Sequence, residues 1–383
     1  MIWNPEARKL NRFCIILALV LLVTAIVPIK AGAATKDNAG FWVEFIDVGQ
    51  GDAALVQCDG HYMLIDGGPA KASSTIYTIL SKNKINQLDV MIATHPDGDH
   101  IGGLSGALNY ATVKTCYSPV VEHDTKPFKN LVKYLDKQSV SVTVPKAGEH
   151  FALGSATVEI IGPITAIDDT NNSSIVTKVT YGKTSFLFMG DAETDEENSL
   201  IKAKTDLSCN VLKVAHHGSA SSTSKAFLTK ANPLIAVISV GNDNGYGHPT
   251  KEVLNSLSSI KNLSLYRTDL QGDIKCISDG KSVSVTTEKT ADKAKLWEHG
   301  DFKPSDDTII PVLTTGSGAS ESIDRNKSAS TTSAYVLNTN TKKFHYPTCN
   351  SVSKMKAKNR QDVNTTRDEI IAMGYDPCGI CHP

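Results

Sequence analysis

The sequence predicts a mixed α/β fold for one large domain, followed by a linker and a small metal-binding α+β module. Between 41 and 287, short apolar and β-branched runs alternate with turn residues and a few helix-like stretches. From 288 to 333 the composition shifts to Ser, Thr, Gly, Lys and Asp, which is typical of a flexible linker, although Trp297 and the apolar run Ile309–Leu313 could dock on the first domain. Aromatic and cysteine residues return from 334 to 383 and mark the small module.

Residues 1–34 have the pattern of a signal peptide. Three basic residues between positions 8 and 12 precede an apolar run from Phe13 to Ile29, and four small residues follow at 31–34. The alternative is a retained membrane anchor, because the run approaches the lower length limit for a spanning helix. We expect cleavage, and therefore a secreted protein without stable membrane association.

Charge and cysteine content narrow the function classes. Removing 1–34 takes away four of the 39 basic and one of the 40 acidic residues, which leaves a net charge of −4. This value does not indicate a general nucleic-acid binder with a basic surface. Seven cysteines remain after removal, and an odd number argues against a complete disulfide framework. No protein partner can be inferred from the sequence.

Strands outnumber helices in the predicted large domain. The predicted strands are Trp42–Val48, Ala53–Gln57, Tyr62–Ile65, Val90–Thr94, Thr157–Ile161, Ile175–Tyr181, Ser185–Met189, Val211–Val214 and Leu234–Ser239. The predicted helices are Ile76–Ser81, Phe128–Asp136, Ala192–Ala203, Lys225–Thr229 and Lys251–Ser258.

Candidate metal ligands follow three of these strands. His95, Asp97, Asp99 and His100 place four ligand types within six residues, a density that no ordinary surface loop requires. Asp191 ends a second apolar strand, and the pair His216-His217 ends a third. Because loops at one sheet edge commonly carry function on a rigid scaffold, we expect these side chains to form one metal centre.

These motifs resemble the metallo-β-lactamase superfamily and, more narrowly, the extracellular hydrolase domain of the ComEC competence proteins. The resemblance rests on the order His-x-Asp-x-Asp-His, Gly-Asp and His-His-Gly-Ser. Further matching segments are 45–53, 64–68, 171–176 and 245–249. The resemblance covers roughly residues 41–285 and implies an αββα sandwich with two metals at one edge of the sheets.

The resemblance also implies a ligand set. His95 and Asp97 would hold one metal, Asp99 and His100 the other, Asp191 would bridge them, and His216 would complete the site. His248 would be an additional ligand or a transition-state contact; the alternative is an ordinary loop histidine beside Pro249. Catalytic roles are expected for Asp99, His100, Lys213 and His248.

The sequence departs from the superfamily's commoner His-x-His-x-Asp-His at Asp97. A carboxylate in place of an imidazole makes the site harder, so manganese or magnesium is considered beside zinc. The separate histidine of the superfamily's third motif has no match, and Asn171 or Asn172 is expected to occupy that space.

Several further residues are expected to support these ligands from behind. They are Asp47, Asp66, Asn172, His217 and Ser219, with a turn role as the alternative for Asp47. Lys213 and Ser219 could also hold a phosphate. Two divalent ions would lower the pKa of a water and stabilise developing negative charge, so the reaction class is hydrolysis. Because the ComEC domain is thought to degrade a DNA strand, the resemblance favours DNA as substrate; a small ester, thioester, lactone or β-lactam is the alternative.

The C-terminal module contains a second set of ligand types. His345, Cys349, Cys378 and Cys381 have the spacing of a structural zinc site, and a module of this size has too little core to fold easily without one. A Cys378–Cys381 disulfide is the alternative in an oxidising compartment. The segment resembles the zinc-binding module of the DNA-repair protein Ada, although His345 stands where that module has a cysteine.

Overall fold

The computed structural model describes residues 40–164, 169–242, 244–299, 333–347, 349–365, 370, 373 and 375–378. The chain divides into two compact units, Met1–Ile309 and Ile310–Pro383. The predicted signal peptide and most of the predicted linker lie outside the described residues. Within the described part of the chain, no helix combines the length and apolar character that crossing a membrane requires.

The first sheet of the first unit has the strand order β15-β14-β1-β2-β3-β4-β5-β6. Its strands are β1 (Phe41–Phe45), β2 (Ala54–Cys58), β3 (His61–Ile65), β4 (Gln87–Ile92), β5 (Thr112–Tyr117), β6 (Val142–Thr143), β14 (Ile274–Ser278) and β15 (Val283–Thr287). The helices associated with it are α2 (Ser73–Lys82), α3 (Gly98–Ile101), α4 (Leu104–Tyr110) and α5 (Lys126–Asp136), preceded by the short η2 (Ala70–Ala72).

The second sheet has the order β13-β12-β11-β10-β9-β8-β7. Its strands are β7 (His150–Leu153), β8 (Ala156–Gly162), β9 (Val176–Tyr181), β10 (Thr184–Phe188), β11 (Val211–Lys213), β12 (Ile235–Ile238) and β13 (Ser264–Arg267). Its helical elements are α6 (Thr194–Lys202), η3 (Ala215–Gly218), α7 (Lys225–Ala231), α8 (Lys251–Ser258), α9 (Thr268–Gln271) and η4 (Lys295–Trp297).

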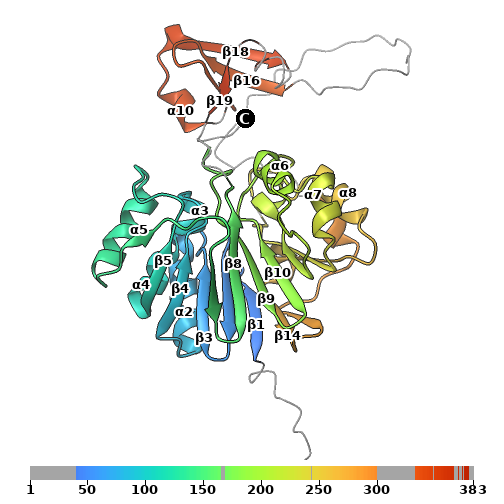
Figure 1. Ribbon diagram of the computed structural model, residues 1–383. Helices are drawn as coiled ribbons and strands as arrows, with labels where there is room; N and C mark the ends of the chain where they lie inside the picture. Colours follow the sequence, from blue (N-terminus) through green and yellow to red (C-terminus); the bar gives the residue numbers. More distant parts are fainter. Residues whose placement is uncertain are drawn as a thin grey trace, which may run out of the picture. The chain divides into compact units, whose positions relative to one another are not determined.

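The two sheets pack face to face, with helices on both outer sides (Figure 1). Alternate residues of a strand point to opposite faces. Phe186 and Phe188 of β10 therefore enter the core between the sheets, whereas Leu187 packs beneath the outer helices. In β1, Phe41 and Phe45 face the same central core, and Trp42 faces the other outer layer. This alternation produces the αββα sandwich that the sequence analysis predicted, and the prediction of the fold class is confirmed.

Each sheet is antiparallel in one half and parallel in the other. The parallel strands are β3 to β6 in the first sheet and β10 to β13 in the second. Parallel neighbours need crossover connections, and helices supply most of them. The carboxyl ends of β4, β10, β11 and β12 lead into loops that approach one another at one edge of the sandwich, as the contacts described below show.

Several elements were not recognised in the sequence. Helix α4 contains Gly106, which disfavours a helix in isolation. A Cβ at Gly106 would collide with the backbone carbonyl of Ser73, so the glycine permits close packing of α4 on α2. The start of the predicted linker packs on the first unit, as considered for Trp297: Leu296 is buried in the second sheet's outer core, Trp297 packs against it, and Arg267 donates to the Leu296 carbonyl oxygen at 3.3 Å.

The second unit contains a four-stranded sheet of order β18-β16-β17-β19. Its elements are β16 (Ser333–Asn338), β17 (Lys343–His345), α10 (Asn350–Ser353), η5 (Ala357–Asn359), β18 (Arg360–Thr365) and β19 (Asp376–Pro377). One small core gathers around Phe344 and Tyr335, and another gathers around Val336, Cys349 and Cys378. This unit is the small α+β region expected from the sequence.

Candidate metal centre

Three loops of the first unit bring the candidate ligands together. Asp97 has an extended backbone and begins α3, so Asp99 and His100 follow it within one helical turn. Asp191 follows Gly190 just after β10, and Gly190 has a positive φ of 54°. After β11, His216 and His217 also have positive φ values, 48° and 53°, which are costly for residues with a side chain. Such backbone conformations are typical of functional sites.

Asp191 lies at the centre of the cluster. Its Oδ2 atom is 3.2 Å from His100 Nε2, 3.5 Å from His217 Nε2, 3.7 Å from His216 Nε2 and 3.8 Å from His95 Nε2. Four imidazoles from two strand ends thus point at one carboxylate, which is only 3% exposed. Asp191, for which the resemblance implies a bridging role, therefore lies where the four imidazoles converge.

Two more carboxylates border this group. Asp97 Oδ2 is 3.9 Å from His95 Nε2, and Asp99 Oδ2 is 3.4 Å from His217 Nε2. Both side chains are about one-third exposed, whereas His95 and His217 are buried. The buried imidazoles of His95 and His217 therefore close one side of the donor set. The partly exposed carboxylates of Asp97 and Asp99 form the side that solvent reaches.

The buried polar atoms test whether this set fits metal ions. The Nε2 atoms of His95, His100 and His217 and the Oδ1 atom of Asp191 are buried and make no hydrogen bond. Buried polar groups are normally paired, so unpaired atoms that converge on one point indicate a missing ligand. Four imidazole nitrogens with three carboxylates suit two divalent cations. The residues present fit a dimetal centre.

Electrostatics in the cluster point the same way. Burial raises the pKa of Asp191, but the neighbouring histidines, led by His100, outweigh burial and hold this pKa well below its ordinary value. Burial lowers the pKa of His217, but Asp191 and Asp52 outweigh it and raise this pKa to about 10. Burial and nearby His100 lower the pKa of His95 to about 3. The carboxylates thus concentrate negative charge that attracts cations.

The opposite nitrogens of the first-loop imidazoles are held by hydrogen bonds. His100 Nδ1 contacts Asp66 Oδ2 at 2.8 Å. Asp66 also accepts from the backbone and hydroxyl of Thr94, at 2.9 and 2.6 Å. His95 Nδ1 lies 3.1 Å from Thr94 Oγ1 and 3.3 Å from Ser174 Oγ. These contacts orient Nε2 of both rings toward Asp191. Asp66, which was expected to support the ligands, contacts the ring nitrogen of His100 that faces away from Asp191.

The histidines after β11 are held by residues that the sequence analysis did not single out as site residues. His217 Nδ1 is 2.9 Å from the carbonyl oxygen of Ser239 and 3.1 Å from Asp52 Oδ1. His216 Nδ1 is 3.2 Å from Glu193 Oε1, which also accepts from Ser221 Oγ at 2.8 Å. Asp52 follows Gly51, and Glu193 follows Asp191 by two positions, but neither spacing indicates a contact with a distant histidine.

The structure places His217 and Lys213 differently from the sequence analysis. His217 was expected behind the ligands, yet its Nε2 faces Asp191 and Asp99 beside the other imidazoles. Lys213 was expected to hold a phosphate, but it is 3% exposed and its Nζ lies 2.6 Å from Asp52 Oδ2. Lys213 is therefore a buried partner of Asp52 behind the ligands, because β11 points its side chain inward.

The remaining predicted residues are distributed around the centre. Asp47 Oδ1 accepts from the backbone N–H of Gly49, which is the turn role kept as its alternative. Asn172 Oδ1 accepts from the N–H groups of Glu193 and Glu196, so it positions the chain after Asp191.

Two further predicted residues lie close to His216 in the sequence or in space. Ser219 Oγ lies 2.9 Å from Ser221 Oγ. His248 is 8% exposed, and its ring centroid is 5.8 Å from that of His216.

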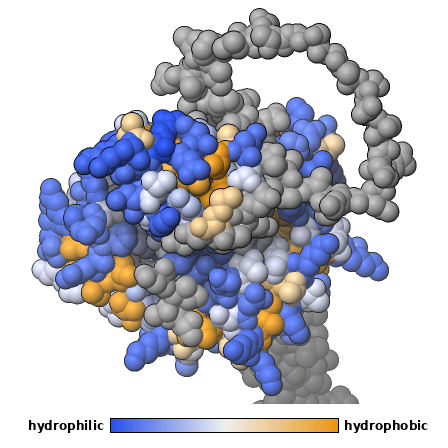
Figure 2. Space-filling model, turned by 90° about the horizontal axis from the view of Figure 1, so that it is seen from above, coloured by the Kyte–Doolittle hydropathy of each residue, from blue (hydrophilic) through white to orange (hydrophobic). Residues whose placement is uncertain are grey.

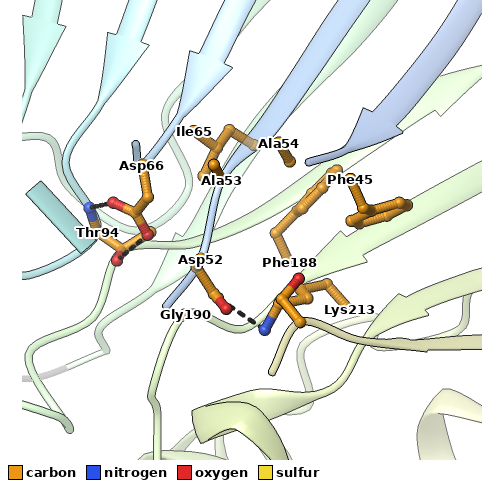
Figure 3. Close-up of a pocket in the computed structure, with 11 residues that line it drawn as sticks. Phe45, Asp52, Ala53, Ala54, Ile65, Asp66, Thr94, Phe188, Gly190 and Lys213 are labelled. Carbon is orange, nitrogen blue, oxygen red and sulfur yellow. Dashed lines mark hydrogen bonds and ion pairs between the residues drawn. The ribbon is translucent and has the colours of Figure 1, made fainter. Parts of the chain in front are cut away.

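A small cavity lies behind the centre, between the carboxylates of Asp52 and Asp66 (Figure 3). Figure 3 shows Asp52 directed at Lys213 and Asp66 directed at Thr94. The cavity measures about 10 Å³, which is close to the space that one water needs. Ser239 Oγ, which lines the cavity, is buried and makes no hydrogen bond, so a polar group for such a water is present.

The second unit holds a separate cluster of ligand types. Ligand atoms of His345, Cys349 and Cys378 lie within 4.8 Å of one another, and all three residues are buried. Both ring nitrogens of His345 make no hydrogen bond. Two thiols and an imidazole are ligands that zinc accepts in structural sites. Cys381, the expected fourth ligand, lies outside the described residues, so its role stays a prediction.

The fold and the Asp/His centre agree with a comparison against protein families. Residues 46–242 match the metallo-β-lactamase superfamily, and the chain belongs to it. Members of this superfamily carry dimetal hydrolase sites, so the class of protein is a metal-dependent hydrolase.

Within this class, the chain is similar to competence-related proteins. It is 30% identical over 252 residues to ComE operon protein 3 of Bacillus subtilis, covering 61% of this chain and 32% of that protein. It is 30% identical over 257 residues to competence protein ComA of Neisseria gonorrhoeae, covering 66% and 34%. It is 33% identical over 239 residues to recombination protein 2 of Haemophilus influenzae, covering 61% and 28%. The chain spans about a third of the length of these relatives.

Similar solved structures include the metallo-β-lactamase fold protein YhfI from Bacillus subtilis, with a TM-score of 0.42 and 12% identity over 64% of this chain and 100% of that chain. The diiron β-hydroxylase CmlA from Streptomyces venezuelae has a TM-score of 0.44 and 13% identity, over 63% of this chain and 54% of that chain.

Proposed function

We propose that the protein is a secreted, metal-dependent phosphodiesterase that cleaves DNA. The observation that carries the hydrolytic part is the convergence of four imidazoles on Asp191, with buried Nε2 atoms that make no hydrogen bond. The similarity to relatives named for competence and recombination supports DNA as the substrate. Secretion is supported by the signal peptide pattern of residues 1–34.

The residues divide into two groups that would hold zinc or manganese ions. His95 and Asp97 belong to one group, Asp99 with His100 and His217 belong to the other, and Asp191 lies between them. His216 Nε2 also faces Asp191, and it is the fourth imidazole of the set. When bound, the ions supply an activated water and positive charge opposite the phosphoryl oxygens.

The chain's own groups prepare the site for this chemistry. Asp66, Asp52 and Glu193 fix the ring orientations of His100, His217 and His216, so little reorganisation is needed during the reaction. His248 lies beside His216 at the border of the centre, and its buried Nδ1 makes no hydrogen bond. We assign to His248 a contact with a group of the substrate beside the ligands.

A row of lysines supports a polyanionic substrate. Lys126, Lys129, Lys133 and Lys137 are exposed on α5 and the residue after it, within an arc of about 80° opposite the buried face of the helix. Thr125, just before α5, donates its hydroxyl to the carbonyl oxygen of Pro96 in the metal-binding loop. Among the coloured atoms of Figure 2, hydrophilic residues predominate and apolar residues gather in separate patches. Exposed lysines on a helix that begins next to the metal-binding loop suit contacts with phosphates.

The C-terminal cluster is part of the same proposal. We assign to His345, Cys349, Cys378 and Cys381 a structural zinc ion, whose binding would contribute most of the stability of this small unit. Residues 335–383 contain seven basic and four acidic residues, and this net charge of +3 would suit contacts with the same DNA substrate.

Cleavage of labelled single-stranded and double-stranded DNA tests the proposed function. The full chain is assayed with zinc or manganese, beside Asp191→Asn and the control Asp136→Asn, an exposed carboxylate at the end of α5. We expect metal-dependent cleavage that falls more than about 100-fold in Asp191→Asn and persists in the control. Bound metal without cleavage of any DNA would overturn the DNA substrate and favour a small ester or amide.

A further inference from the structure

Tyr246 stands out beside the metal centre because it is an exposed aromatic residue in a loop whose polar side chains Asn244 and His248 are buried. Its side chain is 60% exposed, whereas Asn244 and His248 on either side are 5% and 8% exposed. Tyrosine is enriched at binding interfaces, where its ring supplies contact area. The proposed function leaves this residue without a role.

A series of ring contacts connects Tyr246 to the ligands. The rings of Tyr246 and His248 are stacked, with centroids 5.6 Å apart and an interplanar angle of 24°. His248 in turn meets the edge of His216 at 5.8 Å, and His216 Nε2 faces Asp191. The tyrosine ring therefore lies two ring contacts from an imidazole of the metal centre.

Hydrogen bonds hold the loop that carries Tyr246 in place. The Nδ2 group of Asn244 donates to the carbonyl oxygens of Gly241 and His248, each at 2.8 Å. Its Oδ1 atom accepts from the backbone N–H groups of Tyr246 and His248, at 3.3 and 2.9 Å. Because the backbone of the loop is already held in place, little backbone entropy is lost when Tyr246 binds a ligand.

The same loop is anchored to the turn that carries the histidine ligands. Thr250 donates from its backbone N–H and its hydroxyl to the carbonyl oxygen of Gly218, at 2.9 and 3.1 Å. Pro249 packs on Gly218 so closely that an added Cβ would lie 2.7 Å from the proline Cβ. The position of Tyr246 is therefore coupled to the position of His216 and His217.

We propose that Tyr246 is a stacking platform for an unpaired nucleobase next to the phosphodiester that is cleaved. This inference rests on the proposed function and adds a preference for single-stranded substrate. Exposed aromatic rings beside a basic or metal-rich groove bind single strands by stacking on bases, largely independently of sequence. Bases within a duplex already stack on their neighbours, so only an unpaired or flipped base offers its face to Tyr246.

The test measures binding to the metal-loaded full chain with phosphorothioate oligothymidylate, which resists hydrolysis. A matched oligomer of the same length carries abasic sites in place of the bases. Fluorescence anisotropy compares wild type, Tyr246→Phe, Tyr246→Ala and Tyr77→Ala. Tyr77 is a suitable control because it is 43% exposed and contacts the ring of Tyr110 on α4, on the outer side of the first sheet.

We expect Tyr246→Ala to weaken oligothymidylate binding roughly tenfold, with less than about a twofold change in Tyr246→Phe, which keeps the ring. Tyr77→Ala and the abasic oligomer should show no such loss. Equal binding by Tyr246→Ala and wild type would overturn the inference, and so would an equal loss for the abasic oligomer, because that loss would come from the phosphate backbone or from His248. Because this readout needs no cleavage, it separates failure of the stacking inference from failure of the proposed nuclease activity.

Discussion

The two clusters of ligand residues differ in what holds them. In the first unit, each imidazole that faces Asp191 is oriented from behind, by Asp66, Asp52, Glu193, Ser174 or a backbone carbonyl. In the second unit, neither ring nitrogen of His345 makes a hydrogen bond, and Cys349 and Cys378 are themselves part of one small core. One centre is built on an extensive fold, whereas the other supplies much of its own unit's interior.

This difference indicates two roles for metal. The sandwich has three large apolar clusters that do not include the metal ligands, so it has a source of stability independent of metal. The described part of the second unit has two small clusters, and its Cys/His group sits in one of them. We infer that metal serves catalysis in the first unit and folding in the second.

Chelation gives the largest expected contrast between the two units. Structural zinc sites contribute about 10 kcal/mol or more to folding, so removal of metal should unfold the second unit and leave the first folded. Limited proteolysis of the full chain, followed by mass spectrometry, should then show cuts within 334–378 and protection of 41–299. Protection of both regions after confirmed metal loss would contradict the structural role and favour the disulfide alternative.

Substitution of Asp52 tests whether a residue that contacts a histidine ligand from behind contributes separately to metal affinity and to the stability of the first unit. Asp52→Ala leaves Lys213 buried without its carboxylate and removes one partner of His217 Nδ1. An unpaired buried charge costs about 3–5 kcal/mol, and loss of a supporting contact lowers metal affinity by about 10–100-fold. Denaturant unfolding and metal titration measure the two effects separately.

The double variant Asp52→Ala, Lys213→Met distinguishes these contributions. Removing the lysine charge should restore most of the free energy of unfolding lost in the single variant, because the buried charge is no longer unpaired. The metal affinity should stay low, because His217 still lacks the carboxylate. Recovery of both quantities would show that Asp52 acts only on stability and does not position His217.

Glu196 in α6 should produce a smaller and pH-dependent effect confined to the first unit. Burial raises the pKa of this residue to about 7, against an ordinary value near 4.5, while its Oε1 accepts from the backbone N–H of Ile164. Because the folded state holds the proton more tightly, stability falls as pH rises from about 4.5 to about 7 and changes little above that.

Glu196→Gln removes this ionisation. We expect the free energy of unfolding of Glu196→Gln to lie close to that of wild type at pH 4.5 and to exceed it by about 3 kcal/mol at pH 8. Denaturant unfolding at both values measures the difference. Glu252→Gln is the control, since Glu252 is an exposed acidic residue in the first turn of α8. A pH-independent difference for Glu196→Gln would show that its ionisation is not coupled to folding.

Local sequence density explains which candidate residues were found before the structure. His95, Asp97, Asp99 and His100 occupy six positions, and Asp191 follows an apolar strand, so each is visible from its neighbours in the chain. Asp52 and Glu193 are not, because each acts on a histidine that lies far away in sequence or on another loop. A single acidic residue after a glycine or near a helix start has many ordinary explanations.

The sequence alone determined the mixed α/β class and the loops that carry the ligands, because apolar periodicity and dense ligand motifs are local properties; the αββα arrangement was implied only by the family resemblance. Only the tertiary structure decided the depth and direction of side chains. It turned Lys213 inward onto Asp52, aimed His217 at Asp191 through left-handed backbone at 216 and 217, and exposed Tyr246 beside His248. These outcomes depend on which strand ends become neighbours when the two sheets pack, and pairing between distant strands leaves no short-range pattern in the chain.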